Sequence, residues 1–435
     1  MLPETSINWK SFEYKHAANP QRAFENLTYC LFCHEFHQPY GIFRYFNQPH
    51  IETNPILIDD RYIGFQSKYY ADSVLLSSKE NELTEAVKGA ARTYPGITTL
   101  YFYISREFSP SSKKDDVVPA YQKHVEATAK ELGIKTEEVI VASTGVIGQP
   151  MSVEPFAKGI PEIVKGLSAE GHEEAAKAIM TTDTRNKQVA VKVTIGGKEV
   201  TIGGMCKGSG MIHPNMCTML AFVTTDVNIS KKLLQEALSA DVQDTFNMVS
   251  VDGDTSTNDT LLVLANGQAG NHEITEKGAD YDTFVEALHY VNETLAKKIA
   301  GDGEGATALF EVKVIHADNK EDAKTLAKSV ITSSLTKAAL FGHDANWGRI
   351  LCALGYSGAK FDPEAIELYL ESSAGKILIF KDGMAADYSE EEATRILSCS
   401  EVTALVDMKM GEAKATAWGC DLTYDYVKIN ADYRS

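Results

Sequence analysis

Residues 189–202 constrain the fold more than any other part of the chain. Residues 189–195 alternate polar and apolar side chains, and residues 199–202 resume that alternation. Between the two runs stands Gly196-Gly197, a two-residue turn of the kind that joins neighbouring antiparallel strands. The segment therefore predicts a β-hairpin, which fixes two strands of a sheet.

A glycine-rich bend and a buried strand follow the hairpin. The bend, 207–210, carries one cation on a backbone that can approach a ligand closely, and residues 214–215 form a further turn. Residues 219–223 are an apolar run typical of a buried strand. Thr218 thus stands directly before a buried strand, after a turn that can hold a strained peptide.

A hydroxyl residue in this place can serve as an N-terminal nucleophile if the chain is cut between Cys217 and Thr218. Thr218 would then carry both its Oγ and a free α-amine. The reference pKa of an α-amine, about 7.7–8.0, suits it to act as the base for that hydroxyl. The alternative is that Thr218 is only a β-branched residue that packs well in a strand.

Segment 207–222, K-G-S-G-M-I-H-P-N-M-C-T-M-L-A-F, resembles the self-cleavage segment of the bifunctional ornithine acetyltransferase / N-acetylglutamate synthase family of arginine biosynthesis. Six further segments resemble that family in the same order, from about residue 116 to the end. They are 142–148 (A-S-T-G-V-I-G), 179–184 (I-M-T-T-D-T), 251–260 (V-D-G-D-T-S-T-N-D-T), 302–307 (D-G-E-G-A-T), 346–350 (N-W-G-R-I) and 417–435 (A-W-G-C-D-L-T-Y-D-Y-V-K-I-N-A-D-Y-R-S).

The resemblance implies an α/β fold with two packed sheets flanked by helices, an α/β/β/α arrangement. It also implies self-cleavage into an α chain, 1–217, and a β chain, 218–435, which assemble as an α2β2 heterotetramer. The alternation of predicted strands and helices on both sides of Thr218 independently predicts a mixed α/β chain.

The resemblance also assigns the site. Thr218 is the nucleophile, and Thr144 and Gly145 stabilise the oxyanion from a small-residue turn. Thr181, Glu304, Asn430 and Ser435 contact the substrate. Lys207 is the only cation in the bend beside Thr218, so we expect it to meet the substrate α-carboxylate. No metal site is expected.

The activity implied is a ping-pong acetyl transfer, in which Thr218 takes acetyl from N-acetylornithine and passes it to glutamate. This cycle needs no organic cofactor, and acetyl-CoA is left open as a co-substrate. Two alternatives stay open: an N-terminal-nucleophile aminopeptidase or amidase, in which water takes the acyl group, and a non-enzymatic binding protein whose altered first segment has ruined the pocket.

Charge and cysteine content exclude some functions. The formal net charge of −18 and the pI near 5.1 argue against nucleic acid or an anionic membrane as a partner. Seven scattered cysteines fit reduced thiols, and no secretory signal or membrane span is visible, so the cytoplasm is expected. Neither 251–260 nor 302–307 is a Walker phosphate loop, because the chain contains no G-x-x-x-x-G-K-[ST].

The first part of the chain differs from the rest. About half of the aromatic residues lie between Trp9 and Phe108, and the composition changes at 110–115. We therefore divide the chain into a divergent segment, 1–112, the remainder of the α chain, 113–217, and the β chain, 218–435. Cys30-x-x-Cys33-His34 matches the attachment pattern of c-type haem, and the same residues could belong to a zinc site. We expect a coincidence, because no export signal accompanies the motif and a well-spaced second pair of zinc ligands is lacking.

Periodicity and caps predict the other elements. Helices are expected at 119–132, 161–179, 231–240, 281–300, 323–340 and 390–397, the last with a capping box from Ser389 and Glu392. Strands are expected at 138–141, 260–265, 310–315, 366–370, 377–380, 402–408 and 415–418.

Overall fold

The computed structural model describes residues 24, 27–28, 31–32, 56–58, 61–68, 80–104, 117–145, 152, 154–216 and 218–432. The chain divides into two compact units, 1–127 and 128–435. Among the described residues, no helix combines the length and the apolar character that crossing a membrane requires.

The first unit contains a three-stranded sheet of order β1-β2-β3. Strand β1 is antiparallel to β2, and β3 is parallel to β2, so the connection through α3 is a crossover. Phe65 of β2 stacks on Phe32 with ring centroids 4.5 Å apart. The elements are β1 (Ile56–Ile58), β2 (Arg61–Lys68), α3 (Glu80–Thr93), β3 (Thr99–Ile104) and α4 (Val117–Leu132), which spans the division between the units.

The expected hairpin forms the start of a four-stranded sheet in the second unit. Its strands are β4 (Lys187–Ile195), β5 (Lys198–Lys207), β6 (Leu220–Thr225) and β7 (Thr260–Ala265), in spatial order β4-β5-β6-β7. Gly196 and Gly197 make the turn with φ of 56° and 74°, a conformation that suits glycine. Strands β6 and β7 are parallel, and the other neighbours are antiparallel.

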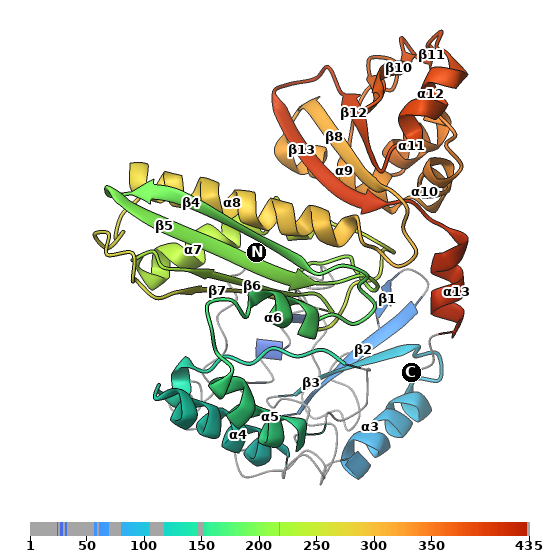
Figure 1. Cartoon of the computed structure of the whole chain (residues 1–435). Coiled ribbons are helices and arrows are strands. Elements are labelled where there is room, and N and C mark those ends of the chain that lie inside the picture. Colours follow the sequence, from blue (N-terminus) through green and yellow to red (C-terminus); the bar gives the residue numbers. More distant parts are fainter. Residues whose placement is uncertain are drawn as a thin grey trace. The chain divides into compact units, whose positions relative to one another are not determined.

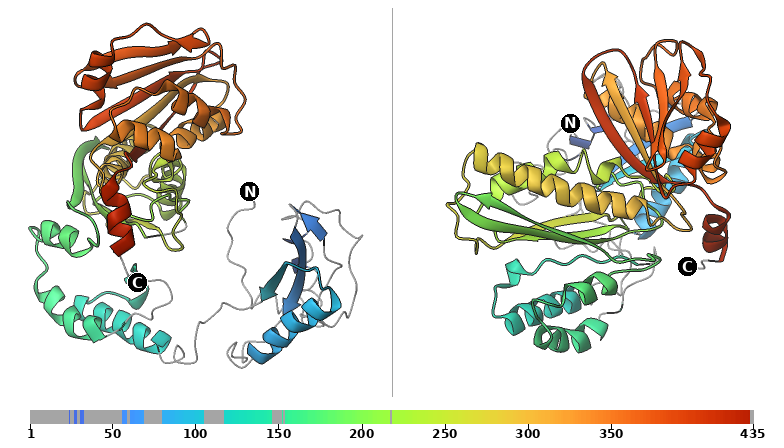
Figure 2. Two further views of the ribbon diagram at one scale, coloured as in Figure 1. Left: turned by 90° about the vertical axis from the view of Figure 1, so that its right-hand side faces the viewer. Right: turned by 45° about the horizontal axis from the view of Figure 1, so that its top comes forward.

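Helix α8 (Ala279–Ala300) lies along β4 and β5, as Figures 1 and 2 show. Its buried side chains include Leu288, Val291 and Leu295, which recur at helical spacing and form the apolar face that packs on the sheet. Helix α7 (Lys231–Asp241) packs against α8 and begins as expected at Ser230, whose Oγ accepts the Leu233 N–H at 3.5 Å.

A second sheet has six strands in the order β11-β10-β9-β12-β8-β13. Only the β8–β12 pair is parallel. Helix α9 packs on β8 and β13, and α8 also contacts β13. The strands are β8 (Leu309–Ala317), β9 (Glu367–Ser372), β10 (Gly375–Lys381), β11 (Met384–Ala385), β12 (Glu401–Asp407) and β13 (Ala413–Cys420). The helices are α9 (Lys320–Thr332), α10 (Ser334–Phe341), α11 (Trp347–Gly355), α12 (Glu390–Leu397) and α13 (Tyr424–Asp432).

One apolar cluster runs from Ile195 to Cys420 and includes buried side chains from both sheets of the second unit. Two mixed sheets flanked by helices thus confirm the predicted α/β class. The strands predicted at 260–265, 310–315, 366–370, 377–380, 402–408 and 415–418 are confirmed, as are the helices at 119–132, 231–240, 281–300 and 390–397.

Three predicted elements are wrong. Residues 138–141 do not form a strand, because the 3-10 turn η2 (Thr136–Glu138) uses this backbone locally, with the Lys135 N–H donating to Glu138 Oε2 at 2.8 Å. Segment 161–179 contains parts of two helices, α5 (Glu154–Lys165) and α6 (His172–Ala178), because Gly166 and Gly171 break the helix between them.

Segment 323–340 likewise contains two helices rather than one. Ser333 ends α9 in an extended conformation, and its Oγ accepts the Thr336 N–H at 3.3 Å as the N-cap of α10. The apolar periodicity continues across Ser333, which explains why it predicts a single helix.

Candidate active site

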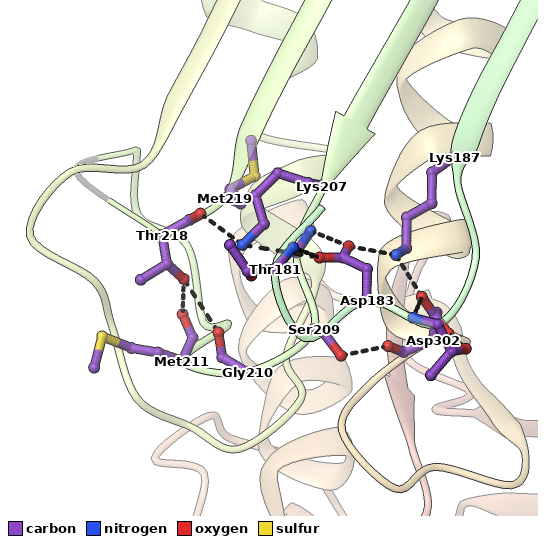
Figure 3. A network of polar contacts seen from close by, with 12 residues as sticks. Thr181, Asp183, Lys187, Lys207, Ser209, Gly210, Met211, Thr218, Met219 and Asp302 are labelled. Atoms are coloured by element: carbon purple, nitrogen blue, oxygen red, sulfur yellow. Dashed lines mark hydrogen bonds and ion pairs between the residues drawn. The ribbon is translucent and has the colours of Figure 1, made fainter. Parts of the chain in front are cut away.

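Thr218 lies two residues before β6 and is half-buried. Its Oγ donates to two backbone oxygens, those of Gly210 and Met211, at 3.1 Å each (Figure 3). Its N–H donates to Asp259 Oδ1. Both atoms that an N-terminal nucleophile would use, the hydroxyl oxygen and the backbone nitrogen, are therefore held by the fold.

The backbone before Thr218 adopts an uncommon conformation. Met211 and Met216 have φ of 54° and 48°, in the left-handed region, which costs about 1–2 kcal/mol for a residue other than glycine. Asp252 fixes the first of these turns, because it accepts the Met211 N–H at 2.7 Å and the Ile212 N–H at 3.1 Å. Cys217, the expected residue on the other side of the cut, lies outside the described residues.

Lys207 ends β5 and is 3% exposed. Its Nζ donates to the carbonyl oxygen of Thr218 at 3.3 Å and lies 4.0 Å from Asp183 Oδ2. Burial lowers the pKa of Lys207, and the negative charge of Asp183 opposes that shift. The one cation of the bend is thus beside the expected nucleophile.

A buried charge cluster lies behind Lys207 and consists of Asp183, Lys187 and Asp302 (Figure 3). Lys187 Nζ donates to Asp183 Oδ1 at 2.6 Å and to Asp302 Oδ2 at 2.5 Å, although it is only 1% exposed. Asp302 also accepts the hydroxyl and the N–H of Thr184. The cluster ties the turn after α6 to the loop after α8.

Asp183 connects this cluster to the predicted substrate contacts. It accepts the Gly208 N–H at 2.7 Å and the Thr181 N–H at 3.1 Å. Burial opposes ionisation of the Asp183 carboxyl, but Lys187 and the Gly208 N–H outweigh it and hold the pKa below its ordinary value. Asp183 is therefore an ionised anchor for Thr181, Gly208 and, at longer range, Lys207.

Glu304 and Asn430 meet although they are 126 residues apart. Asn430 Nδ2, on α13, donates to Glu304 Oε2 at 2.9 Å. The Glu304 carboxylate also lies against Gly210, where a Cβ would come within 2.4 Å of it. Gly210 is one of the two residues whose carbonyl accepts the Thr218 hydroxyl, so Glu304 is brought to the same place as the nucleophile.

The other predicted site residues have fewer contacts that connect them to Thr218. Thr144 and Gly145 follow Ser143, whose carbonyl accepts the Asn258 side-chain N–H at 3.3 Å. Asn258 precedes Asp259, the residue that holds the Thr218 N–H, so this segment reaches the same loop. Ser435 lies outside the described residues, as do Cys30, Cys33 and His34.

Sequence reasoning missed four buried charged residues that organise the site, namely Asp183, Lys187, Asp259 and Asp302. Asp183 and Asp259 stand inside segments that carry the family resemblance, which is the signal that could have drawn attention to them. A lysine at the start of a strand, like Lys187, gives no such signal. Among the described residues, no group of three His, Cys, Asp or Glu side chains could hold a metal ion.

Comparison with known proteins places residues 115–435 in the ArgJ family. The arginine biosynthesis bifunctional protein ArgJ of Caldanaerobacter subterraneus subsp. tengcongensis is 52% identical over 307 residues, which are 71% of this chain and 76% of that protein. The ArgJ protein of Thermotoga neapolitana is 50% identical over 314 residues, 72% of this chain and 79% of that one.

A solved structure is also similar, the arginine biosynthesis bifunctional protein ArgJ from Bacillus halodurans. It is 48% identical and covers 49% of this chain and 98% of its own, with a TM-score of 0.47. From the extent and identity of the sequence matches, we conclude that this chain belongs to the ArgJ family.

Proposed function

We propose that this protein is an acyltransferase of arginine biosynthesis that moves acetyl from N-acetylornithine to glutamate through an acetyl ester on Thr218. Membership in the ArgJ family supports the pathway. The observation that carries the proposal within the molecule is Thr218 itself, whose hydroxyl and nitrogen are both held at the start of a buried strand beside the buried Lys207.

Maturation comes first. Thr218 Oγ attacks the carbonyl carbon of Cys217, the C–N bond breaks, and the proton lost by the hydroxyl passes to the leaving nitrogen. Water then hydrolyses the resulting ester, which leaves a carboxylate on Cys217 and restores the Thr218 hydroxyl. The left-handed backbone at Met216 supports this step, because strain next to the scissile peptide is relieved when the chain separates.

The transfer cycle uses the α-amine that cleavage creates. That amine takes the proton of Thr218 Oγ while the oxygen attacks the acetyl carbonyl of N-acetylornithine, and it returns the proton to the ornithine amine as the C–N bond breaks. The amine of glutamate then attacks the acetyl ester by the reverse chemistry. Thr144 and Gly145 donate to the oxygen that becomes negative in each tetrahedral intermediate.

Substrate recognition uses opposite charges within an acidic protein. Lys207 pairs with the α-carboxylate shared by N-acetylornithine and glutamate, and Glu304, aided by Asn430, faces the amino group of ornithine. Thr181 and Ser435 complete the polar lining. Glu304 lies against Gly210 and Lys207 donates to the Thr218 carbonyl oxygen, so one anion and one cation lie near the nucleophile, which supports this division of roles.

Maturation is tested with Thr218→Ala, which removes the hydroxyl together with the γ-methyl group. The purified chain should run as one uncut band on a denaturing gel, whereas Thr218→Ser should still be cut because a hydroxyl remains. Thr224→Ala, on the strand that follows Thr218 and with an exposed side chain, is the matched control and should be cut like the parent. Cutting of Thr218→Ala would refute this step.

The acceptor is tested by incubating the mature enzyme with N-acetylornithine and glutamate. We expect N-acetylglutamate and ornithine in equal amounts, and no product from the Thr218→Ala chain. Free acetate without N-acetylglutamate would instead identify a hydrolase, and no turnover by a cut enzyme would favour a binding protein. Use of acetyl-CoA, the α2β2 assembly and a cytoplasmic location stay predictions.

A further inference from the structure

Asp259 stands in the loop before β7 and holds two successive amides with one oxygen atom. Its Oδ1 accepts the N–H of Thr218 and, at 3.0 Å, the N–H of Met219. The first of these nitrogens belongs to the peptide bond that the proposed maturation breaks. Asp259 is therefore already bonded to the atom that becomes the α-amine of the mature enzyme.

The second carboxylate oxygen of Asp259 lacks a partner. Among the residues that the structure describes, nothing donates a hydrogen bond to Oδ2, although Asp259 is only 8% exposed. A buried carboxylate oxygen without a donor destabilises the folded chain, because the oxygen loses its hydrogen bonds to water and gains none in return. In agreement, burial raises the pKa of Asp259, with the Met219 and Thr218 N–H groups and Lys207 opposing the shift.

Cleavage changes the number of donors at this nitrogen. As an amide, the nitrogen of Thr218 carries one N–H, which Oδ1 already accepts. As a terminal ammonium it carries three, and as a free amine two. The mature chain thus gains a donor next to Asp259 Oδ2, which has no donor among the described residues of the uncut chain.

We propose that Asp259 is a positioning residue that binds the new α-amino group of Thr218 through both carboxylate oxygens and holds it beside the Thr218 hydroxyl. This inference rests on the proposed function, in which the α-amine of Thr218 acts as the base. The position of this nitrogen would otherwise depend on rotation about the first bonds of a free chain end, which is a motion that cleavage releases.

The charge of Asp259 also affects the proton affinity of that amine. The other charged groups around it come from separate elements, namely Lys207 on β5, Asp183 after α6, Asp252 in the loop before β7 and Glu304 after α8. Lys207 disfavours the ammonium and the carboxylates favour it. Because Asp259 alone among these carboxylates bonds the nitrogen directly, its removal should lower the pKa of the ammonium most.

The test is Asp259→Asn, which keeps the shape and removes the charge, with Asp254→Asn as the control. Asp254 lies in the same loop with an exposed side chain, and the change removes the same charge. Acetyl transfer from N-acetylornithine is measured against pH for the mature full-length enzymes. We expect Asp259→Asn to lower kcat at least about tenfold with little change in KM. The acid limb of its kcat/KM profile should move down by about one pH unit.

Parental kcat and an unmoved acid limb in a cut Asp259→Asn enzyme would overturn the inference. If Asp259→Asn remains uncut, Asp259→Glu is examined, because it restores the carboxylate. Recovery of cleavage and of the parental acid limb in Asp259→Glu supports the inference. An Asp259→Glu chain that is as uncut as Asp259→Asn overturns it. Thermal melting shows that each variant folds. Should the parent and Asp254→Asn form no N-acetylglutamate, the proposed function fails separately.

Discussion

Replacing Lys187 with methionine tests the buried charge cluster. Methionine nearly matches the length of the lysine side chain but carries no charge, so Lys187→Met leaves Asp183 and Asp302 without their shared cation. The two contacts it removes are 2.6 and 2.5 Å long and lie at a side chain that is 1% exposed. The carboxylates cannot move to water without opening the turn after α6 and the loop after α8.

The size of the effect follows from this burial. Removing one partner of a buried ion pair typically costs about 3–5 kcal/mol, because the remaining charge is left uncompensated. For a unit the size of 128–435, unfolding entropies per residue convert this loss into a fall in melting temperature of about 5–8 °C. The turn that presents Thr181 should loosen as well.

Lys192→Met supplies the matched control. Lys192 lies on the same strand and contacts Glu199 at 2.6 Å, the same distance as Lys187 to Asp183, but the two side chains are 64% and 67% exposed. A pair so exposed contributes little to stability because water screens it, so this variant should melt within about 2 °C of the parent. Circular dichroism melts at one pH and salt concentration compare the two, and equal shifts would refute the reasoning.

Three further predictions concern the site. Gly210→Ala places a Cβ at 2.4 Å from the Glu304 carboxylate and should lower kcat/KM at least about tenfold. Gly203→Ala is the control and should be tolerated, because the nearest atom to its new Cβ is 3.7 Å away. Equal activity of the two variants would contradict this prediction. Burial lowers the pKa of His213 to about 4, below its ordinary value of 6.5. As the pH falls through 6.5, the imidazole of the unfolded chain is therefore protonated while that of the folded chain stays neutral. Stability should therefore drop between about pH 6.5 and pH 4, and His213→Asn should flatten that slope in urea unfolding; an unchanged slope would be the contrary result. Thr144→Ala should lower kcat about 10²–10³-fold with KM nearly unchanged, and single-turnover acetylation at the parental rate would remove Thr144 from the mechanism.

Local sequence pattern predicted most of the sheet that carries the nucleophile. Alternation over 189–202, the Gly196-Gly197 turn and the apolar run 219–223, which forms β6, were sufficient, because each depends on neighbours in the chain. The same reasoning failed at Ser333, where a capping hydrogen bond interrupts a continuing apolar period. The spacing of apolar residues indicates which face of a helix is buried, but it does not indicate where the backbone changes direction.

The site was less accessible to sequence reasoning. Thr218 and Lys207 are adjacent to the predicted hairpin, so their proximity could be anticipated. The contact between Glu304 and Asn430 joins separate elements, and only the family resemblance brought the two residues to notice. Lys187 was missed because burial of its charge depends on Asp302, which is 115 residues away and supplied by a different element.

Intact mass of the purified protein, before and after incubation with N-acetylornithine alone, tests the central claim most directly. We predict two chains whose masses place the cut between Cys217 and Thr218, and, without glutamate as acceptor, the added mass of one acetyl group on the chain that begins with Thr218. Addition of glutamate should remove that acetyl group. A single uncut mass from an enzyme that still forms N-acetylglutamate, or an acetyl group on the chain that ends at Cys217, would contradict the account.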